Sequence, residues 1–175
     1  MWYVIQTQTG REQELTECIE CVLKGNGYRA CFVIEQECVW RNAGELLEYH
    51  KPLFPSYVIA DTDTPEEFFL ALKRVPKLSK LLRTDCEFWA IREEEKKLLC
   101  QMMELDECLV RRSFVTLDED GNILTAQGPL SFFLEKIVRK RIRKRIVTVE
   151  VELLGEKRRK QIHSWGCWER ICPKL

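Results

Sequence analysis

A short segment with two prolines sets the strongest constraint on the fold. Residues 51–59 read Lys-Pro-Leu-Phe-Pro-Ser-Tyr-Val-Ile, and an apolar run continues after the second proline. Because proline has no N–H to donate to a β-ladder, we expect Pro52 and Pro55 in a loop that leads into a strand. Side chains alternate along a strand, so Tyr57 and Ile59 are predicted to share one face of a sheet.

The first 108 residues alternate between short apolar runs and amphipathic helical patterns. Thr64 and Pro65, followed by two glutamates, predict a helix start, because proline fits the first helical position and acidic side chains complement the helix dipole. This alternation is typical of a small α/β sandwich with helices packed on an antiparallel sheet. The predicted elements are a strand at 2–7, a helix at 12–24, strands at 29–35 and 57–60 separated by a loop or short hairpin at 36–50, a helix from 65, and a helix at 93–107.

The helix predicted at 12–24 has one apolar face. Its apolar residues recur at helical spacing, and its glutamates are assigned largely to the opposite side. The apolar residues are Leu15, Cys18, Ile19 and Val22, and the glutamates are Glu12, Glu14, Glu17 and Glu20.

The rest of the chain has the pattern of a β-domain. Gly121-Asn122 and Gly128-Pro129 are turn signals, and a β-branched run extends over 137–151. These features predict a small β-barrel of about five strands. The predicted fold class is therefore α+β, with an α/β sandwich at 1–108 and a β-barrel at 109–175.

A net charge of zero conceals two oppositely charged halves. Residues 1–109 carry 13 Lys+Arg and 20 Asp+Glu, a net charge of −7, whereas residues 110–175 carry 15 and 8, a net charge of +7. Two halves of opposite charge indicate two modules with different partners. The basic half is the candidate for contact with nucleic acid.

Two basic runs in the second half carry that prediction. A positive stripe contacts phosphates with salt-dependent affinity and little sequence preference, and Trp165 and Trp168 are candidates for stacking on unpaired bases. The other interpretation is a solvated cationic surface that balances the acidic half. The predicted contact residues are Lys136, Arg139, Lys140, Arg141, Arg143, Lys144, Arg145, Lys157, Arg158, Arg159 and Lys160, and the predicted buried side consists of Ile142, Ile146, Val147, Val149 and Val151.

The first half resembles the NGN domain of the NusG family of transcription elongation factors. The resemblance rests on three stretches in the family's order, and it covers essentially all of residues 1–108. The stretches are Trp2-Tyr3-Val4, Pro52-Leu53-Phe54-Pro55-Ser56-Tyr57-Val58, and the run from Leu72 to Leu82.

This resemblance implies that the first half binds the clamp helices of bacterial RNA polymerase through an apolar depression on its sheet. A second polymerase contact, across the cleft, is implied at the start of the second helix, where adjacent phenylalanines cannot both be buried on one face. The alternative for each apolar residue is ordinary core packing. The implied polymerase-binding residues are Tyr57, Ile59, Phe54, Trp2, Phe68, Phe69 and Lys73, with Val75 and Leu82 as possible neighbours.

The second half resembles a KOW domain, through Gly128-Pro129-Leu130 and the residues from Ile137 to Gly155. It departs from the usual motif at Glu135, where a glycine is expected, and at Phe132-Phe133. The chain is most similar to the specialised antiterminator paralogs of the LoaP group. That resemblance implies a monomeric, cytoplasmic factor that keeps polymerase elongating while the basic domain contacts nascent RNA.

Two other function classes stay open. A general NusG-type factor would use its KOW domain to bind a protein, such as a termination factor or a ribosomal protein. A thiol redox or zinc protein would use some of the nine cysteines, with Cys18 and Cys21 as the candidate pair.

We expect neither a membrane span nor an enzymatic activity. No apolar run approaches the roughly 18 residues that cross a bilayer, and no signal pattern begins the chain. No catalytic arrangement surrounds His50 or His163, so we expect no catalytic residues, no cofactor and no metal. Without a signal pattern, we expect the cysteines to be reduced and mostly buried.

Overall fold

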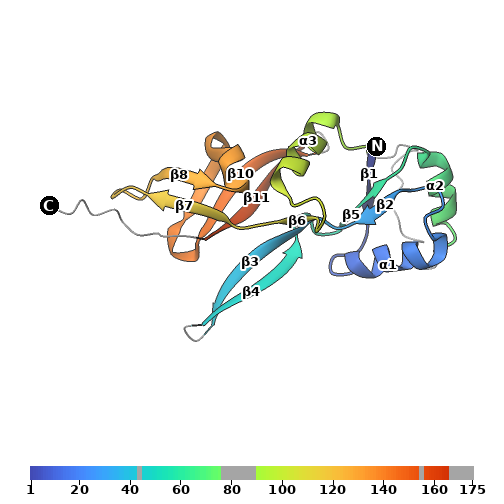
Figure 1. Ribbon diagram of the computed structural model, residues 1–175, viewed down its shortest axis with the longest axis horizontal. Coiled ribbons are helices and arrows are strands. Elements are labelled where there is room, and N and C mark those ends of the chain that lie inside the picture. Colours follow the sequence, from blue (N-terminus) through green and yellow to red (C-terminus); the bar gives the residue numbers. More distant parts are fainter. Residues whose placement is uncertain (43–44, 76–89, 154–155, 166–175) are drawn as a thin grey trace. The chain divides into compact units, whose positions relative to one another are not determined.

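The computed structural model describes all residues except 43–44, 76–89, 154–155 and 166–175 (Figure 1). The chain divides into two compact units. Unit 1 consists of Met1–Ile34 and Phe54–Lys97, and unit 2 consists of Glu35–Leu53 and Leu98–Leu175. Residues 35–53 thus group with the C-terminal strands, although they precede the predicted domain boundary at residue 108, and that boundary stays a prediction.

Unit 1 is a three-stranded antiparallel sheet with two helices on one face. The strand order is β1-β5-β2. Its elements are β1 (Trp2–Gln6), α1 (Glu12–Leu23), β2 (Ala30–Phe32), β5 (Tyr57–Asp61) and α2 (Pro65–Leu72). The predicted strands and the helix start at Pro65 are confirmed, although β2 is shorter than predicted and Thr64 makes no side-chain capping hydrogen bond.

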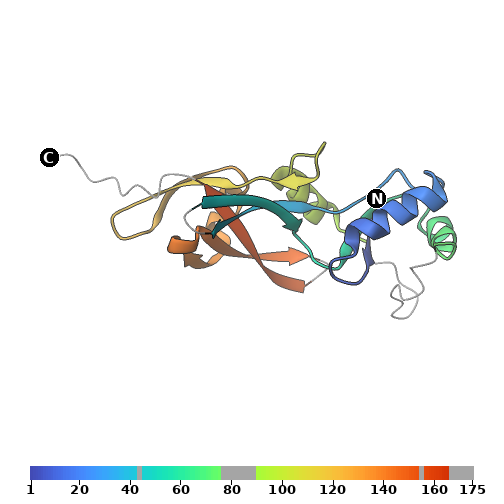
Figure 2. The same ribbon diagram turned by 90° about the horizontal axis from the view of Figure 1, so that it is seen from below.

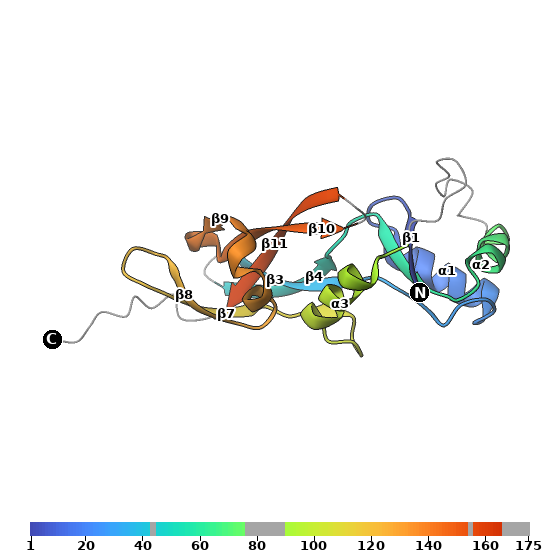
Figure 3. The same cartoon turned by 90° about the horizontal axis from the view of Figure 1, so that it is seen from above.

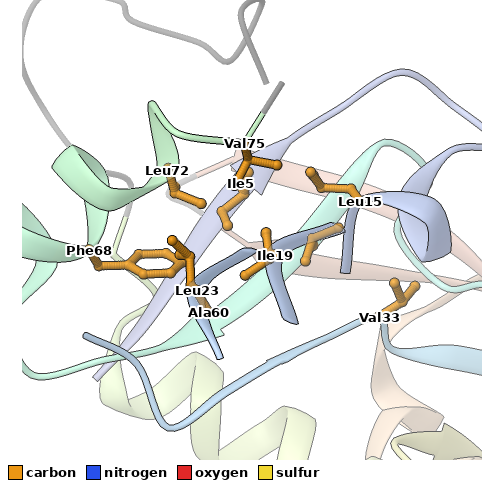
Figure 4. Packing of buried hydrophobic residues seen from close by; sticks show 10 residues of the cluster. Ile5, Leu15, Ile19, Leu23, Val33, Ala60, Phe68, Leu72 and Val75 are labelled. Carbon is orange, nitrogen blue, oxygen red and sulfur yellow. The ribbon is translucent and has the colours of Figure 1, made fainter. Parts of the chain in front are cut away.

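The core of unit 1 lies between the sheet and these helices (Figure 4). Ile5, Val58 and Ala60 come from the sheet face that carries even-numbered residues of β5, and the helices supply leucine, isoleucine and phenylalanine side chains. The buried cluster is Ile5, Leu15, Ile19, Leu23, Val33, Val58, Ala60, Phe68, Leu72 and Val75. Tyr57 and Ile59 alternate with these residues and therefore lie on the opposite sheet face, as predicted.

Unit 2 begins with a long hairpin that the sequence indicated only as a loop or short hairpin. Strands β3 (Glu35–Asn42) and β4 (Glu45–Pro52) pair along eight residues each and run side by side in Figures 1 and 3. Strand β6 (Leu109–Val110) adds to β3 in parallel. Pro52 ends β4 rather than lying in a loop, which is permitted because β4 is an edge strand with no further partner in this sheet.

Helix α3 (Glu93–Met102) joins residues of both units and is shorter than the predicted span of 93–107. Residues 103–108 instead form turns, in which the Leu109 carbonyl accepts a hydrogen bond from the Glu104 N–H at 2.9 Å. Within the described residues, no helix is long and apolar enough to cross a bilayer.

The C-terminal part of unit 2 is a five-stranded sheet, which agrees with the predicted strand number. The order is β8-β7-β11-β10-β9, and the long strands β10 and β11 run beside one another in Figures 2 and 3. Its elements are β7 (Ser113–Leu117), β8 (Ile123–Gln127), the 3-10 helix η2 (Pro129–Lys136), β9 (Ile137–Arg141), the 3-10 turn η3 (Ile142–Lys144), β10 (Ile146–Leu153) and β11 (Glu156–Trp165).

Buried side chains from strands and from η2 make the core of this sheet. Leu130 and Phe133 of η2 are fully buried, as are Val147 and Val149 of β10. The β-branched run at 137–151 forms two strands rather than one, because η3 interrupts it and Arg145, with a φ of 55°, reverses the chain. Ile142 consequently lies on the turn with 39% of its surface exposed, and its predicted burial is wrong.

Candidate functional site

Tyr57 emerges from a tight turn at the start of β5. The Tyr57 N–H donates to the Phe54 carbonyl at 3.2 Å, which closes a four-residue turn with Pro55 second and Ser56 third. Ser56 has a φ of 73°. A proline followed by a residue with positive φ is the arrangement of a type II turn, which normally favours glycine at its third position.

Three residues from the N-terminal segment hold this turn. The Ser56 N–H donates to Oε1 of Glu12 at 2.7 Å, and the Thr7 N–H donates to the Ser56 carbonyl at 2.8 Å. The hydroxyl groups of Ser56 and Thr9 lie 2.5 Å apart. The turn is therefore tied on both sides to the residues from Thr7, directly after β1, to Glu12, the first residue of α1.

The structure buries Glu12, whose assignment to the solvent side of α1 is wrong. Only 3% of its surface is exposed. Glu12 precedes Leu15, Thr16 and Ile19 by three, four and seven residues, so helical geometry places it in the same buried stripe. That spacing was the signal in the sequence, and the acidic nature of the side chain obscured it.

The sheet face that carries Tyr57 also carries two other predicted polymerase-binding residues, Trp2 and Ile59. Trp2 and Val4 occupy the same face of β1 by register, and the Trp2 ring meets that of Phe32 edge-on at 5.2 Å. Trp2 and Ile59 are 6% and 4% exposed, whereas Tyr57 is half-buried. Core packing therefore explains why Trp2 and Ile59 are apolar. Of these three side chains, that of Tyr57 is the most accessible.

Phe54 is also buried, at 6% exposure, where the turn meets β5. Lys96, in the part of α3 that belongs to unit 1, places its Nζ 5.2 Å from the centre of the Trp2 ring. The Ile91 N–H donates to the Trp2 carbonyl at 2.8 Å. The segment before α3 therefore lies against β1 at the edge of this face.

The two phenylalanines of α2 have different environments, as adjacent helical positions require. Phe68 is 3% exposed and lies 5.4 Å from the Tyr28 ring, within the core. Phe69 is half-buried, and the Nζ of Lys73 lies 5.4 Å from its ring centre. Leu70, which sequence reasoning did not single out, is 59% exposed beside this cation–aromatic pair. Val75 is buried in the core, and Leu82 lies outside the described residues.

The first basic run is exposed around η3. Five of its seven cationic side chains are exposed and two are half-buried. The Nζ of Lys140 donates to Oδ1 of Asn122 at 3.2 Å, which ties the run to the turn between β7 and β8. The exposed residues are Lys136, Arg139, Lys140, Arg143 and Lys144, and the half-buried ones are Arg141 and Arg145.

The second basic run, on β11, is not a single stripe of exposed cationic side chains. Arg159 is exposed and pairs in register with Glu150, whereas Lys160 is half-buried and pairs with buried Val149. Lys157 and Arg158 pair in register with Glu152 and Val151, and Trp165 pairs with Phe114. Trp168 lies outside the described residues. Because β10 brings glutamates opposite this run, the first run is the stronger candidate for phosphate contact.

A buried ion pair that sequence reasoning missed lies elsewhere in unit 2. Arg112 is 4% exposed in its side chain, and its Nη2 lies 3.1 Å from Oε1 of Glu37 and 2.5 Å from Oε1 of Glu48. Burial alone would raise the pKa of Glu37, but hydrogen bonds from the Arg112 backbone and guanidinium hold that pKa below its usual value. The pair ties the β3–β4 hairpin to the segment before β7.

Unit 2 also exposes apolar side chains in two places. On the hairpin, Trp40 and Leu47 form a cross-strand pair at 61% and 44% exposure, next to Tyr49 at 43%. On the C-terminal sheet, Phe114 is 58% exposed and Leu124 is 55% exposed. Large exposed apolar groups of this kind are often found where a protein binds a partner.

Six of the cysteines lie in the described part of the chain, and none of these six forms a disulfide. Cys18, Cys21, Cys31, Cys38, Cys100 and Cys108 are all free. Cys38 alone among these six is buried and Cys21 is exposed, so the expectation of mostly buried thiols is wrong for them. Burial raises the pKa of Cys31 to about 12, which makes it a poor nucleophile. Among the described residues, no three His, Cys, Asp or Glu side chains are grouped as metal ligands.

Comparison with known proteins assigns the family. A family model described as "Transcription termination factor nusG" matches residues 1–99, more than half of the chain. The chain belongs to the NusG family. The predicted resemblance to the NusG family is thereby confirmed. Members of this family are non-enzymatic transcription factors that interact with RNA polymerase.

Individual NusG relatives are distant. The transcription termination/antitermination protein NusG of Campylobacter jejuni is 23% identical over 137 residues, which cover 75% of this chain and 76% of that protein. A structure of Thermotoga maritima NusG has a TM-score of 0.48 at 15% identity, covering 93% of this chain and 92% of that one. An MjSpt4:Spt5 complex has a TM-score of 0.37 at 12% identity, covering 87% and 84%. Because both TM-scores are below 0.5, no conclusion rests on these two structures.

Proposed function

We propose that this NusG-family protein binds bacterial RNA polymerase through unit 1 and promotes continued elongation. The observation that carries the proposal is the family match over residues 1–99, which includes the Tyr57 turn. A factor that binds the closed polymerase cleft more tightly than the open one shifts the population toward the closed state. Continued elongation is then favoured over pausing and termination.

Tyr57 is the proposed centre of the contact with the polymerase clamp helices. Its ring is half-buried, so it can pack on a partner while its hydroxyl stays near water. Trp2 and Ile59 on the same sheet face, and Phe54 in the turn, are buried and form the proposed apolar base of this surface. Phe69 and Leu70 of α2, with Lys73 directly after the helix, form the proposed second contact, because Leu70 and Lys73 are exposed and Phe69 is half-buried next to Lys73.

The test is the affinity of the intact protein for purified bacterial RNA polymerase. Truncating an interface aromatic at a binding centre typically costs about 2 kcal/mol or more, so Tyr57→Ala should weaken binding at least about thirtyfold. Tyr49→Ala is the matched control, since Tyr49 is a surface tyrosine of unit 2. Unchanged affinity of the Tyr57 variant, or an equal loss in both variants, would contradict the proposed surface.

We further propose that the exposed basic run at η3 contacts nascent RNA. Among the described residues, no acidic side chain forms an ion pair with Arg139, Arg143 or Lys144. Cationic side chains without acidic partners are available for phosphate, and each phosphate contact adds to the salt dependence of binding.

The measurement is RNA affinity as a function of salt concentration. Replacing Arg139, Arg143 and Lys144 with glutamine should weaken binding to single-stranded RNA and reduce the slope of log K against log salt by about 2. A variant with glutamine at Lys24, Arg74 and Lys97, exposed residues of unit 1, is the control. Equal slopes in the wild type and the η3 variant would exclude this surface.

A second candidate function has its own support on the C-terminal sheet. Phe114, Leu124 and Phe132 are each about half exposed or more, at 58%, 55% and 47%. Exposed apolar groups favour a protein partner, as in a general NusG-type factor whose KOW domain binds a termination factor or a ribosomal protein. Under this alternative the η3 substitutions leave RNA affinity unchanged, and Phe114→Ser abolishes partner capture.

Membership of the specialised LoaP group is also a proposal. Its support is the dense basic run, which suits recruitment by a structured RNA better than a neutral surface does. A termination assay with candidate leader RNAs tests it. Read-through that depends on the leader sequence supports the specialised role, and read-through that is independent of it supports the general one.

A further inference from the structure

We propose that Glu12 is a positioning residue that holds the Ser56 turn and thereby fixes the orientation of Tyr57 for polymerase binding. This inference rests on the proposed function of Tyr57. Glu12 lies 44 residues before Ser56 in the sequence, yet its carboxylate accepts the Ser56 N–H at 2.7 Å. The side chain is 97% buried, so its contact with the turn is not an incidental surface contact.

The two central residues of the turn offer one backbone N–H, and the turn's own hydrogen bond does not use it. The Tyr57 N–H reaches the Phe54 carbonyl, and Pro55 has no N–H. The Ser56 N–H is the remaining donor, and it is partly buried in a turn whose first residue, Phe54, is 6% exposed. A donor that is partly shielded from water benefits from an acceptor within the protein, and Glu12 supplies a carboxylate, which makes the stronger kind of hydrogen bond.

Glu12 itself is held where a carboxylate is favoured. It is the first residue of α1, where the free N–H groups of the helix create a positive field. The main chain of the turn is thus connected to a rigid helix through one side chain. On the other side of Ser56, its carbonyl accepts a hydrogen bond from the Thr7 N–H.

Residue 56 makes this support necessary. A φ of 73° is readily adopted by glycine but is unfavourable for serine. Without an external acceptor, other conformations of the Pro55–Ser56 peptide compete with the observed one. Because Tyr57 follows directly, each alternative conformation changes the direction of its side chain. The apparent affinity for polymerase then falls in proportion to the fraction of molecules in the binding conformation.

The experiment compares Glu12→Ala, Glu12→Gln and Glu17→Ala in the full-length protein labelled with 3-fluorotyrosine. Glu17→Ala is the matched control, because it removes the same charge from an exposed position of α1. The chain has four tyrosines, and Tyr57→Phe assigns the resonance of Tyr57. Each variant is measured by fluorine NMR and by affinity for purified RNA polymerase.

We expect Glu12→Ala to shift or broaden the Tyr57 resonance, to leave that of Tyr49 unchanged, and to weaken polymerase binding about tenfold or more. Glu12→Gln retains an acceptor oxygen and should show a smaller effect on both readouts, which keeps the test decisive if the alanine variant does not fold. Glu17→Ala should change neither.

An unchanged Tyr57 resonance in folded Glu12→Ala and Glu12→Gln would overturn the positioning role, whatever the polymerase affinity. Failure of the proposed function has a different signature. In that case the Tyr57 resonance still responds to Glu12→Ala, which supports the positioning role, but the wild-type protein does not bind polymerase.

Discussion

The positive φ of Ser56 limits which residues this position of the turn can accept. An L-residue in the left-handed region costs about 1–2 kcal/mol, and a β-branched side chain raises that cost. We therefore expect Ser56→Val to lower the free energy of unfolding by about 2 kcal/mol, and Ser56→Gly to remain within about 1 kcal/mol of the wild type. Urea denaturation of the three proteins measures the order. A valine variant as stable as the glycine variant would contradict the assigned turn geometry.

Single residues also show how far sequence reasoning extends at this scale. Helical geometry correctly predicted that Phe68 and Phe69 could not be buried equally. The burial of Glu12 was missed, since its partner is a backbone N–H 44 residues away and only the folded chain brings the two together. Long-range contacts to the main chain leave no periodic trace in a sequence.

At the scale of elements, Arg112 stabilises the β3–β4 hairpin. Its guanidinium is buried against Glu37 and Glu48 of the β3–β4 hairpin. Removing one member of a buried ion pair leaves an uncompensated charge, so Arg112→Ala should lower the free energy of unfolding by about 3 kcal/mol. Arg111→Ala is the control, because Arg111 contacts Glu104 and Glu107 on the surface, where ion pairs add little to stability, and its loss should be much smaller. Equal losses in chemical denaturation would contradict the structural role of Arg112.

The same contact predicts how the hairpin responds to acid. The pKa of Glu37 is below its usual value in the folded protein, so the unfolded chain binds a proton more readily. The stabilisation is present at neutral pH and is lost as pH falls through the folded-state pKa. Hydrogen exchange in β3 and β4 should therefore accelerate under acid conditions in the wild type. Arg112→Met should flatten that dependence, and the same acid response in both proteins would argue against the linkage.

At the level of elements, strands and helices with regular patterns were predictable and their pairing was not. The strand after Pro55 and the helix at Pro65 follow from local chemistry. The β3–β4 hairpin was underestimated because polar and apolar residues mix along it, and Arg112 stabilises it from a distant segment. The position of the break at η3 was not predicted, since Arg145 adopts a left-handed conformation without the glycine that usually signals one.

Across the whole molecule, each unit carries its own candidate surface. Unit 1 presents the Tyr57 turn, and unit 2 presents the basic run at η3. Phosphate contacts alone give weak, unspecific binding. If unit 1 is bound to polymerase, unit 2 is held at a high local concentration near the emerging RNA, and weak contacts become effective.

The most direct test of the central claim is site-specific crosslinking of the intact protein to transcribing RNA polymerase. A photoreactive phenylalanine analogue replaces Tyr57 in one protein and Tyr49 in another. We predict a crosslink to the polymerase subunit that carries the clamp helices from position 57, and none to that subunit from position 49. A crosslink to that subunit from position 49 with none from position 57 would contradict the assignment of the polymerase-binding surface to the Tyr57 turn.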